Sequence, residues 1–364
     1  MVIKKSRVPI SDILLVGILP GFAKKWMYRS KGYRIGRNVK IGFGSVVIGK
    51  DILINDGVEI GFLTILRSEK LRIGSFAKIG SMTFIDTPIV NLGEDSKINE
   101  QVFIGGLQLP NSQFALGARS QISQMTYINP YRSITVGDDS ALGGHCLLFG
   151  HTSWQNVFEG YAAYFDDIEI GNSVSVSWRV FVAPGAKIGD GAIIGTNSLV
   201  NGVIPPQSLA TGSPARVVSR EPYLCRELKI EEKRTLFNKI VQELKDYFRD
   251  AGWGVNEKEG RVFLNGLGMQ RMGPRRKYSL SICDEAFEIE AIKQPKDFDL
   301  LVSLEVIDEI TRKDLEKAGI HWLEINSRKR SALPDPLTDE VAMWFRRYGV
   351  RFERQGRKEN RILL

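Results

Sequence analysis

The sequence predicts a mainly β protein, in which a parallel β-solenoid is preceded by a helical segment and followed by a small α/β domain. Three observations predict this architecture. An aliphatic residue followed by glycine recurs every six residues through most of the first 205 residues. The first 32 residues are basic and amphipathic, and beyond residue 220 the repeat gives way to alternating strand and helix patterns. We therefore expect three parts, residues 1–32, 33–220 and 226–364.

The six-residue period is clearest over residues 182–199, where Ile188-Gly189 and Ile194-Gly195 begin consecutive repeats. In a hexapeptide solenoid each repeat supplies one short strand and three repeats make one coil. The aliphatic side chain then points inward and stacks on its equivalent about 18 residues later, with coils about 4.8 Å apart. Glycine, asparagine and aspartate at the second to fourth positions suit corners that need a positive φ. A glycine-rich loop region would not show such unbroken runs.

The N-terminal 40 residues contain ten Lys or Arg residues and one acid, Asp12, interleaved with large apolar residues. This pattern predicts one or two short amphipathic helices over residues 9–32. Two interpretations remain open. The helices cap the open end of the solenoid, where a bare coil would expose an apolar edge, or they attach the protein to an anionic membrane face. Nucleic-acid binding is disfavoured, because the basic excess is local and no nucleic-acid motif accompanies it.

Composition indicates a soluble protein of the cytoplasm, with contact to the inner membrane face as the open alternative. The chain is 43% hydrophobic and 25% charged, which is ordinary for a globular protein. No apolar run reaches the ~20 residues of a membrane span, and Pro20 and Gly21 interrupt the longest N-terminal one. No signal-peptide cleavage pattern follows it. Three widely spaced cysteines, Cys146, Cys225 and Cys283, fit a reducing compartment.

Two segments interrupt the repeat, residues 105–114 and the polar and aromatic residues 151–167. Insertions in solenoids emerge as loops and are often functional. After the exit at Pro205-Pro206, apolar spacing predicts a helix over Ile230–Ala251, with Leu236, Ile240, Leu244 and Phe248 on its apolar side. The remainder predicts a small α/β domain. Its expected strands are Arg261–Asn265, Tyr278–Cys283, Leu300–Leu304 and His321–Ile325, and its expected helices are Ile307–Ala318 and Thr338–Tyr348.

The histidines are the strongest candidates for chemistry. The chain has three, His145, His151 and His321. His145 and His151 are six residues apart, so a three-sided coil places them on successive faces, which is a poor arrangement for a metal pair. The chain has no Cys-x-x-Cys, Walker or Gly-x-Ser-x-Gly motif. We therefore expect no metal site.

Two segments carry a resemblance to a known family. Residues 134–151 form repeats that end at His151, and residues 170–216 continue through Pro205-Pro206 to Gly212-Ser213-Pro214-Ala215-Arg216. Over residues 33–220 the chain resembles the hexapeptide-repeat acyltransferases, whose fold is a left-handed parallel β-helix, and most of all the O-acetyltransferases of sugars and polysaccharides. The resemblance implies an acetyl-CoA donor, His151 as general base, and a homotrimer with the coenzyme in a groove between two subunits.

The same resemblance assigns roles to further residues. Backbone amides at Ser177, Ala183 and Gly195 would bind the pantetheine arm, and Lys187 and Arg216 would bind the phosphates of CoA. Glu159, Asp166 and Asp167 are alternative partners that could orient the imidazole. The expected acceptor contacts are Trp154, Asn156, Glu159 and Trp178.

The expected acceptor is a sugar hydroxyl of a surface polysaccharide or lipid-linked glycan precursor. Two alternatives remain open. One is N-acylation of an amino sugar, and the other is a non-catalytic solenoid scaffold whose C-terminal domain is the working part.

Overall fold

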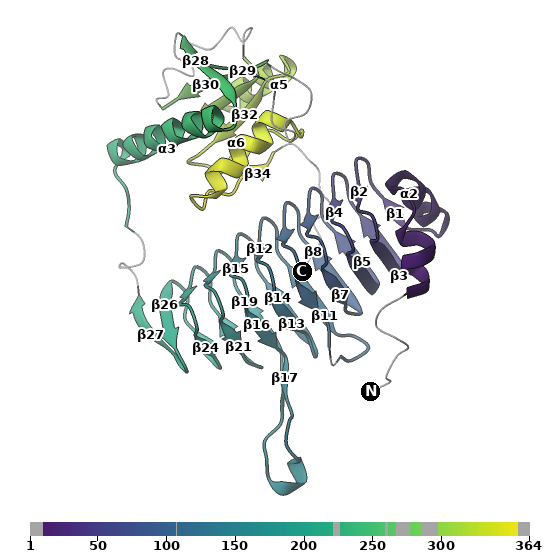
Figure 1. Ribbon diagram of the computed structural model, residues 1–364. Helices are drawn as coiled ribbons and strands as arrows, with labels where there is room; N and C mark the ends of the chain where they lie inside the picture. The colour runs from purple at the N-terminus through teal and green to yellow at the C-terminus, as the bar shows by residue number, and fades with distance from the viewer. Residues whose placement is uncertain are drawn as a thin grey trace. The chain divides into compact units, whose positions relative to one another are not determined.

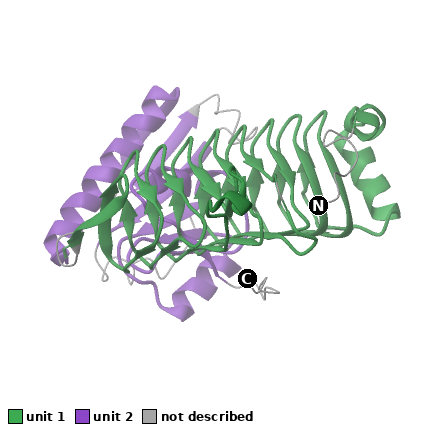
Figure 2. Ribbon diagram, turned by 90° about the horizontal axis from the view of Figure 1, so that it is seen from below, with its two compact units in different colours: residues 1–226, 361–364 green, residues 227–360 purple. Residues whose placement is uncertain are grey.

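The computed structural model describes residues 10–106, 108–220, 226–258, 261–266, 277–284 and 298–355. The chain forms two compact units, a first that extends to Arg226 and a second that begins at Glu227 (Figure 2). The basic residues Lys4, Lys5 and Arg7 and the cysteine Cys225 lie outside the described residues.

The first unit is a three-sided parallel β-solenoid, with helices at its N-terminal end and an antiparallel strand pair at the other (Figure 1). We name its sides faces A, B and C. Face A consists of β7 (Phe84–Asp86), β10 (Phe103–Ile104), β13 (Tyr127–Asn129), β16 (Leu147–Phe149), β21 (Phe181–Val182) and β24 (Leu199–Val200). Face B consists of β1 (Arg34–Ile35), β8 (Ile89–Leu92), β11 (Gln113–Leu116), β14 (Ser133–Val136), β19 (Ile168–Ile170), β22 (Lys187–Ile188) and β25 (Val203–Ile204).

Face C is the most regular side. It consists of β2 (Lys40–Ile41), β4 (Glu59–Ile60), β6 (Lys78–Ile79), β9 (Lys97–Ile98), β12 (Gln121–Ile122), β15 (Ala141–Leu142), β20 (Ser175–Val176), β23 (Ile193–Ile194) and β26 (Ser208–Gly212). The long strands β3 (Val46–Ile54) and β5 (Ile65–Ile73) run through faces A and B without a break, and β27 (Ala215–Arg220) pairs antiparallel with β26. The predicted parallel solenoid is thus confirmed.

The coil length differs from the expected 18 residues over most of the solenoid. Ile54 pairs with Ile73, nineteen residues later, and Ile122 pairs with Leu142, twenty residues later. The expected spacing appears only near the end, where Val176 pairs with Ile194. The sequence pattern is also cleanest in this segment. The 18-residue coil length inferred from it therefore does not apply to the earlier coils.

All of this variation lies at one corner. In the coil around β5, the inward-pointing residues of faces B, C and A follow one another at six-residue steps, from Ile54 to Ile60 to Leu66. The step from face A to face B is longer. It is seven residues from Leu66 to Ile73, twelve from Ile104 to Leu116, and twenty-two from Leu148 to Ile170. Both predicted interruptions therefore emerge at the corner between faces A and B.

The repeat glycines serve two purposes, of which the sequence predicted one. At the fourth position the corner has a positive φ, as at Gly44 and Asp139, although residues such as Met82 also adopt it there. The second position differs. Gly117 has a φ outside the left-handed region, but a Cβ there would lie 2.3 Å from the carbonyl carbon of Gly137 in the next coil. The glycine at the second position is thus needed for close approach of backbones.

The small residues at the fifth position of the repeat lie inside the coil, and several of them are hydroxyl residues. Thr64 donates its hydroxyl to Gly80 O at 2.8 Å, and Ser120 donates to Gly137 O at 2.6 Å. These bonds connect one coil to the next. They satisfy buried hydroxyls that would otherwise cost free energy in the apolar interior.

The N-terminal helices cover the first coil. They are α1 (Ile10–Asp12), the π-helical turn η1 (Ile13–Gly17) and α2 (Gly21–Ser30). The Lys24 side chain is fully buried, and its Nζ donates to Gly42 O at 2.6 Å and to Ser45 O at 3.1 Å. The Tyr28 hydroxyl accepts Val47 N–H at 2.8 Å. The segment thus pairs polar backbone groups that the first coil would otherwise leave unpaired.

The outer side of these helices is apolar and open. Six large apolar side chains are exposed there: Ile10, Leu14, Leu15, Ile18, Phe22 and Trp26. Of the helices in the described part of the chain, none combines the length and apolar character that crossing a bilayer requires.

The second unit has a mixed seven-stranded sheet. The strands, in sheet order, are β28 (Trp253–Lys258), β29 (Arg261–Gly266), β30 (Lys277–Cys283), β31 (Leu300–Ser303), β32 (His321–Glu324), β33 (Lys329–Arg330) and β34 (Glu353–Arg354). Its helices are α3 (Ile230–Asp250), α5 (Glu309–Lys317) and α6 (Pro336–Arg346). The predicted α/β character is confirmed. On α3, however, the side chain of Leu236 is exposed and its neighbour Phe237 is buried instead.

Candidate functional site

The corner between faces A and B gathers the irregular features of the solenoid. It carries the loop after β10 and, two coils further on, a hairpin of β17 (His151–Thr152) and β18 (Tyr164–Phe165), which projects from the solenoid (Figure 1). The 3₁₀ turn η2 (Val157–Glu159) forms its tip, where Asn156 Oδ1 accepts Phe158 N–H at 3.1 Å. Regular corners have no space for extra residues, so this corner is where a solenoid can add a site.

His151 lies at the root of the hairpin. Its backbone is in register with Phe165, and Gly150 before it accepts Asp166 N–H at 3.0 Å. The imidazole is surrounded by aromatic rings, with centroids 6.0 Å away for Phe149, 6.2 Å for Tyr131 and 6.3 Å for Phe165. Sequence reasoning selected His151 but did not identify these three rings as its neighbours, although Phe149 and Phe165 stand in or beside the interruption at residues 151–167.

The environment of His151 favours the neutral imidazole. The side chain is only 9% exposed, and burial lowers its pKa below the ordinary value of 6.5. Nδ1 is buried without a hydrogen-bond partner in the described part of the structure. A neutral imidazole has one nitrogen that accepts a proton. His151 can therefore act as a base at neutral pH.

The three acids that were candidates to orient His151 have other partners. Glu159 accepts Asn156 Nδ2 at 3.0 Å within the tip of the hairpin. Asp166 accepts Asp167 N–H at 2.8 Å, and Asp167 accepts Ser133 N–H at 2.9 Å. Among the described residues, therefore, these acids make hydrogen bonds to backbone and amide groups and not to the imidazole.

The predicted acceptor contacts do not form one cluster. Trp154, Asn156 and Glu159 lie in the projecting hairpin, where Trp154 is 85% exposed. Trp178 lies at the opposite edge of face A, at the corner between faces C and A, with its ring over Gly144 and 6.0 Å from the ring of His145. The hairpin also exposes Phe158, at 97%. Isolated rings on a projecting hairpin leave apolar surface that a neighbouring molecule could cover.

The predicted coenzyme contacts are spread over two corners of the solenoid, face B and strand β27. Ser177 and Gly195 follow β20 and β23, at the corner between faces C and A. Ala183 follows β21, at the same corner as His151. Lys187 is on face B, where its Nζ is 2.9 Å from Glu169 Oε1, and Arg216 is exposed on β27. Within one chain, Ser177 and Gly195 are thus separated from His151 by the width of face A.

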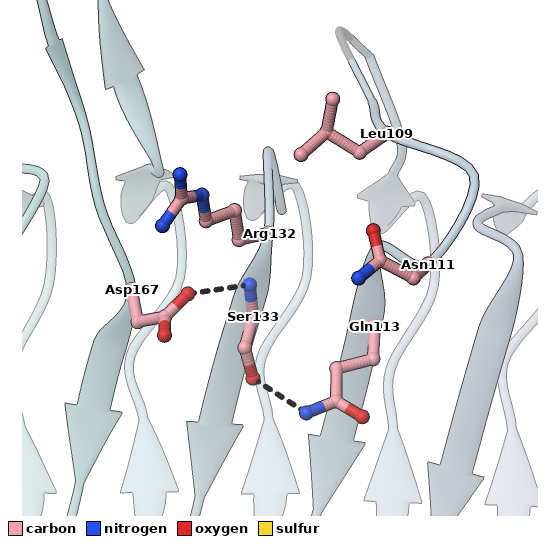
Figure 3. A pocket seen from close by; sticks show the side chains of 6 residues that line it. All are labelled: Leu109, Asn111, Gln113, Arg132, Ser133 and Asp167. Atoms are coloured by element: carbon pink, nitrogen blue, oxygen red, sulfur yellow. Dashed lines mark hydrogen bonds between the residues drawn. The ribbon is translucent and has the colours of Figure 1, made fainter.

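A cavity of about 360 Å³ opens at the corner of faces A and B, on the face B side. It is lined by Leu109, Asn111, Gln113, Arg132, Ser133 and Asp167 (Figure 3). Two hydrogen bonds cross its floor, from Ser133 N–H to Asp167 Oδ1 and from Gln113 Nε2 to Ser133 Oγ at 3.0 Å. Apart from Asp167, none of these residues was predicted. The sequence signal that could have revealed them is the Asn129-Pro130-Tyr131-Arg132 break in the repeat.

A metal site is not apparent in the described ranges, which hold no group of three His, Cys, Asp or Glu residues that could bind an ion. His145, the less favoured of the two candidate histidines, occupies the corner between faces C and A with a φ of 57°. His145 and His151 were expected on successive faces; they lie instead at the two corners that bound face A.

Comparison with known proteins finds relatives that share part of the chain's sequence. No protein-family model matches the chain. The galactoside O-acetyltransferase of Escherichia coli strain K12 is 31% identical over 114 residues, which are 29% of this chain and 56% of that protein. A putative lipopolysaccharide biosynthesis O-acetyl transferase of the same strain is 27% identical over 124 residues, 31% of this chain and 62% of that protein. The chain thus spans less than two thirds of the length of either relative.

Among solved structures, a hexapeptide-repeat acetyltransferase of Vibrio cholerae in complex with acetyl coenzyme A matches at 22% identity and a TM-score of 0.30. The match covers 36% of this chain and 70% of that one. This likeness concerns the fold alone, and the sequence relationship comes from the E. coli proteins. In its repeat and its coil sequences, the first unit of this chain is thus similar to hexapeptide-repeat sugar O-acetyltransferases over about half of their length.

Proposed function

We propose that the protein transfers an acetyl group from acetyl-CoA to a sugar hydroxyl, with His151 as general base. The single observation that carries this proposal is the buried His151 imidazole at the irregular corner, ringed by Tyr131, Phe149 and Phe165 and with a lowered pKa. The relationship to sugar O-acetyltransferases supports the reaction class.

The proton route follows from the chemistry of a thioester. A sugar hydroxyl is a weak nucleophile at neutral pH, so the imidazole removes its proton as the oxygen attacks the carbonyl carbon. The tetrahedral intermediate then collapses, the C–S bond breaks, and the imidazolium returns the proton to the departing thiolate. Backbone N–H groups of the donor's binding groove would stabilise the oxyanion.

The site requires two chains in this proposal. If Ser177 and Gly195 bind the pantetheine arm, the donor of one chain lies a face away from that chain's own His151. A neighbouring solenoid in a homotrimer would bring its His151 to that groove, and the exposed Trp154 and Phe158 of the hairpin would gain a covering surface. Lys187 and Arg216 remain the proposed contacts for the phosphates of CoA.

His151→Ala tests the base. We expect a folded protein whose acetyl transfer falls at least about a hundredfold, because a positioned general base typically contributes about 10²–10⁴. His145→Asn is the matched control, since asparagine tolerates the positive φ at that corner and His145 has no proposed role. Acetyl transfer is followed by release of CoA thiol on a panel of sugars. Unchanged turnover in His151→Ala would remove this residue from the mechanism.

The shared site is tested by mixing two inactive variants. His151→Ala lacks the base, and Ser177→Trp blocks the groove. After dissociation and reassembly together, about a quarter of the sites in random heterologous trimers would combine an intact base with an intact groove. Recovered activity near that fraction supports a site between chains. No recovery, or a monomer by light scattering, would contradict it.

The acetyl acceptor and the alternatives are separated by simple assays. An amine acceptor would give an amide that resists mild alkaline hydrolysis, whereas the proposed ester is cleaved. A non-catalytic scaffold predicts that acetyl-CoA does not bind, which calorimetry measures directly. Mass spectrometry of surface glycans from cells with and without the gene identifies the acceptor.

For the N-terminal helices we propose peripheral contact with an anionic membrane face. The support is the exposed apolar row that includes Leu15, Phe22 and Trp26, together with the basic residues of this segment. Phe22→Ser/Trp26→Ser should reduce co-sedimentation with vesicles that contain anionic lipid. Equal sedimentation of this variant and the unaltered protein would contradict the proposal.

A further inference from the structure

The cavity at the corner of faces A and B lies beside the candidate base. His151 and Phe165 are cross-strand partners, and Asp167 is two residues beyond Phe165 on the returning strand. Cross-strand Cα atoms are about 5 Å apart and each residue advances about 3.3 Å, so the Cα of Asp167 lies roughly 8 Å from that of His151. On the other side, Arg132 directly follows Tyr131, whose ring contacts His151 and Phe165.

Arg132 is the cation of this cavity. Its side chain is exposed into the opening, and Figure 3 shows its guanidinium above the floor formed by Ser133 and Asp167. Over the described residues it makes no ion pair and no side-chain hydrogen bond. Most other arginines on the solenoid have carboxylate partners one coil away, as Arg67 has in Asp86 and Arg119 in Asp139. Arg132 departs from that pattern, and it does so beside a cavity.

Asp167, the acid of the cavity, is already engaged. Its Oδ1 accepts Ser133 N–H at 2.9 Å. The pKa of Lys187 is raised, chiefly by its hydrogen bond and ion pair with Glu169 and to a smaller degree by the charges of Asp166 and Asp167. The five N–H donors of the exposed Arg132 are therefore accessible to a ligand in the cavity.

The remaining lining suits a sugar. Asn111 and Gln113 present amide groups that both donate and accept, and Leu109 offers an apolar edge. Planar polar side chains around a small cavity can satisfy several hydroxyls at once. The volume of about 360 Å³ is at the small end of ligand pockets, which are about 300–1,000 Å³. One monosaccharide unit with one substituent is of that size.

We propose that this cavity binds an acidic sugar unit of the acceptor, with its carboxylate on Arg132. A guanidinium matches a planar carboxylate with two parallel hydrogen bonds. With the charged group held there, the hydroxyl that receives the acetyl group is about one sugar ring away, beside His151. This inference rests on the proposed acetyl transfer for the identity of the ligand as an acceptor, and it restricts that acceptor to glycans with acidic units.

Direct binding tests the cavity without acetyl-CoA. Calorimetry on the full chain compares trigalacturonate with trigalactose, its neutral counterpart, and with galactose 6-phosphate to distinguish carboxylate from phosphate. We expect the acidic trisaccharide to bind at least tenfold more tightly than the neutral one, and Arg132→Gln to remove that preference. Arg132→Lys should keep part of it, because it retains charge but not the paired geometry.

Two further variants sharpen the result. Lys70→Gln makes the same change of charge at an exposed position in the same row of face B, two coils before Gln113, and should leave binding unchanged. Asp167→Asn keeps the acceptor for Ser133 N–H and removes a negative charge, so it should strengthen binding of the acidic trisaccharide. Circular dichroism checks that each variant is folded.

The outcomes separate this inference from the proposed function. Three results would overturn the inference, even if the protein acetylates neutral sugars. The unaltered protein does not bind trigalacturonate, or it binds trigalactose equally well, or Arg132→Gln binds trigalacturonate as tightly as the unaltered protein does. Tighter binding of galactose 6-phosphate than of the trisaccharide would also overturn the assignment of a carboxylate. Arg132-dependent binding of the acidic trisaccharide in a protein that transfers no acetyl group would support the cavity and remove the proposed activity instead.

Discussion

The glycine at the second position of the repeat provides the sharpest test of how the solenoid is held together. In Gly117→Ala the new Cβ would lie 2.3 Å from the carbonyl carbon and 2.5 Å from the carbonyl oxygen of Gly137 in the next coil. Real Cβ atoms do not approach backbone so closely, so the two coils must separate. The hydrogen bonds most affected are Gly117 N–H to Val136 O at 2.7 Å and Ser120 Oγ to Gly137 O at 2.6 Å.

The cost can be estimated from these contacts. Overpacking of this kind costs about 1–3 kcal/mol, and weakening one buried hydrogen bond adds about 0.5–1.5 kcal/mol. Replacing glycine also restricts the unfolded chain, which returns about 0.4–1 kcal/mol. The free energy of unfolding of the solenoid should therefore fall by roughly 0.5–4 kcal/mol in Gly117→Ala.

Gly202→Ala is the matched control, because a Cβ at Gly202 meets no atom within 4 Å and its φ is outside the left-handed region. It should be neutral or slightly stabilising. Urea denaturation followed by far-ultraviolet circular dichroism compares the two midpoints. Equal midpoints would refute the view that close approach of coils, and not backbone conformation, requires these glycines.

Two other predictions concern the site and the N-terminal helices. Because burial lowers the pKa of His151 below 6.5, the acid limb of kcat/KM should lie below pH 6.5. The unfolded chain binds the extra proton first, so the stabilising contribution of neutral His151 is present above pH 6.5 and is lost as the pH falls towards the folded pKa. An acid limb above pH 7 would contradict this. Lys24→Met leaves Gly42 O and Ser45 O without their donor and should lower the free energy of unfolding by about 1–3 kcal/mol. Lys25→Met, at a less buried lysine, should leave the free energy of unfolding unchanged. Equal urea midpoints for Lys24→Met and Lys25→Met would contradict this role of Lys24.

Much of the fold was predictable because the solenoid repeats a local rule. Inward aliphatic residues such as Ile54, Ile60 and Leu66 are separated by six residues, and each repeat satisfies its backbone only by pairing with the coils beside it. The six-residue period of the sequence therefore predicts which strands pair between neighbouring coils. The coil length was predicted less well, since a seventh residue at the corner of faces A and B leaves the inward pattern of the other faces unchanged.

The candidate site was predictable only where one residue type carries the chemistry. His151 stands out in a chain with three histidines. The aromatic rings around His151 do not stand out in the sequence. Tyr131, Phe149 and Phe165 come from three segments that meet only at this corner of the fold. The coenzyme contacts illustrate the same limit. Ser177, Ala183 and Lys187 are near one another in sequence, yet a solenoid turns through about 120° with each hexapeptide and distributes them over different sides.

The irregular corner explains how a rigid repeat can carry a specific site. Faces B to C and C to A keep six-residue steps, which preserves the stacked core, while the step from A to B absorbs every added residue. The loop after β10 lines the Arg132 cavity, and so does Asp167, two residues after the hairpin strand that pairs with His151. Since neither insertion touches the inward aliphatic ladder, the loop that lines the cavity and the hairpin root that holds the base can vary independently. Changes in acceptor specificity within this architecture should therefore come from residues 105–113 and 130–133, with the base and the core unchanged.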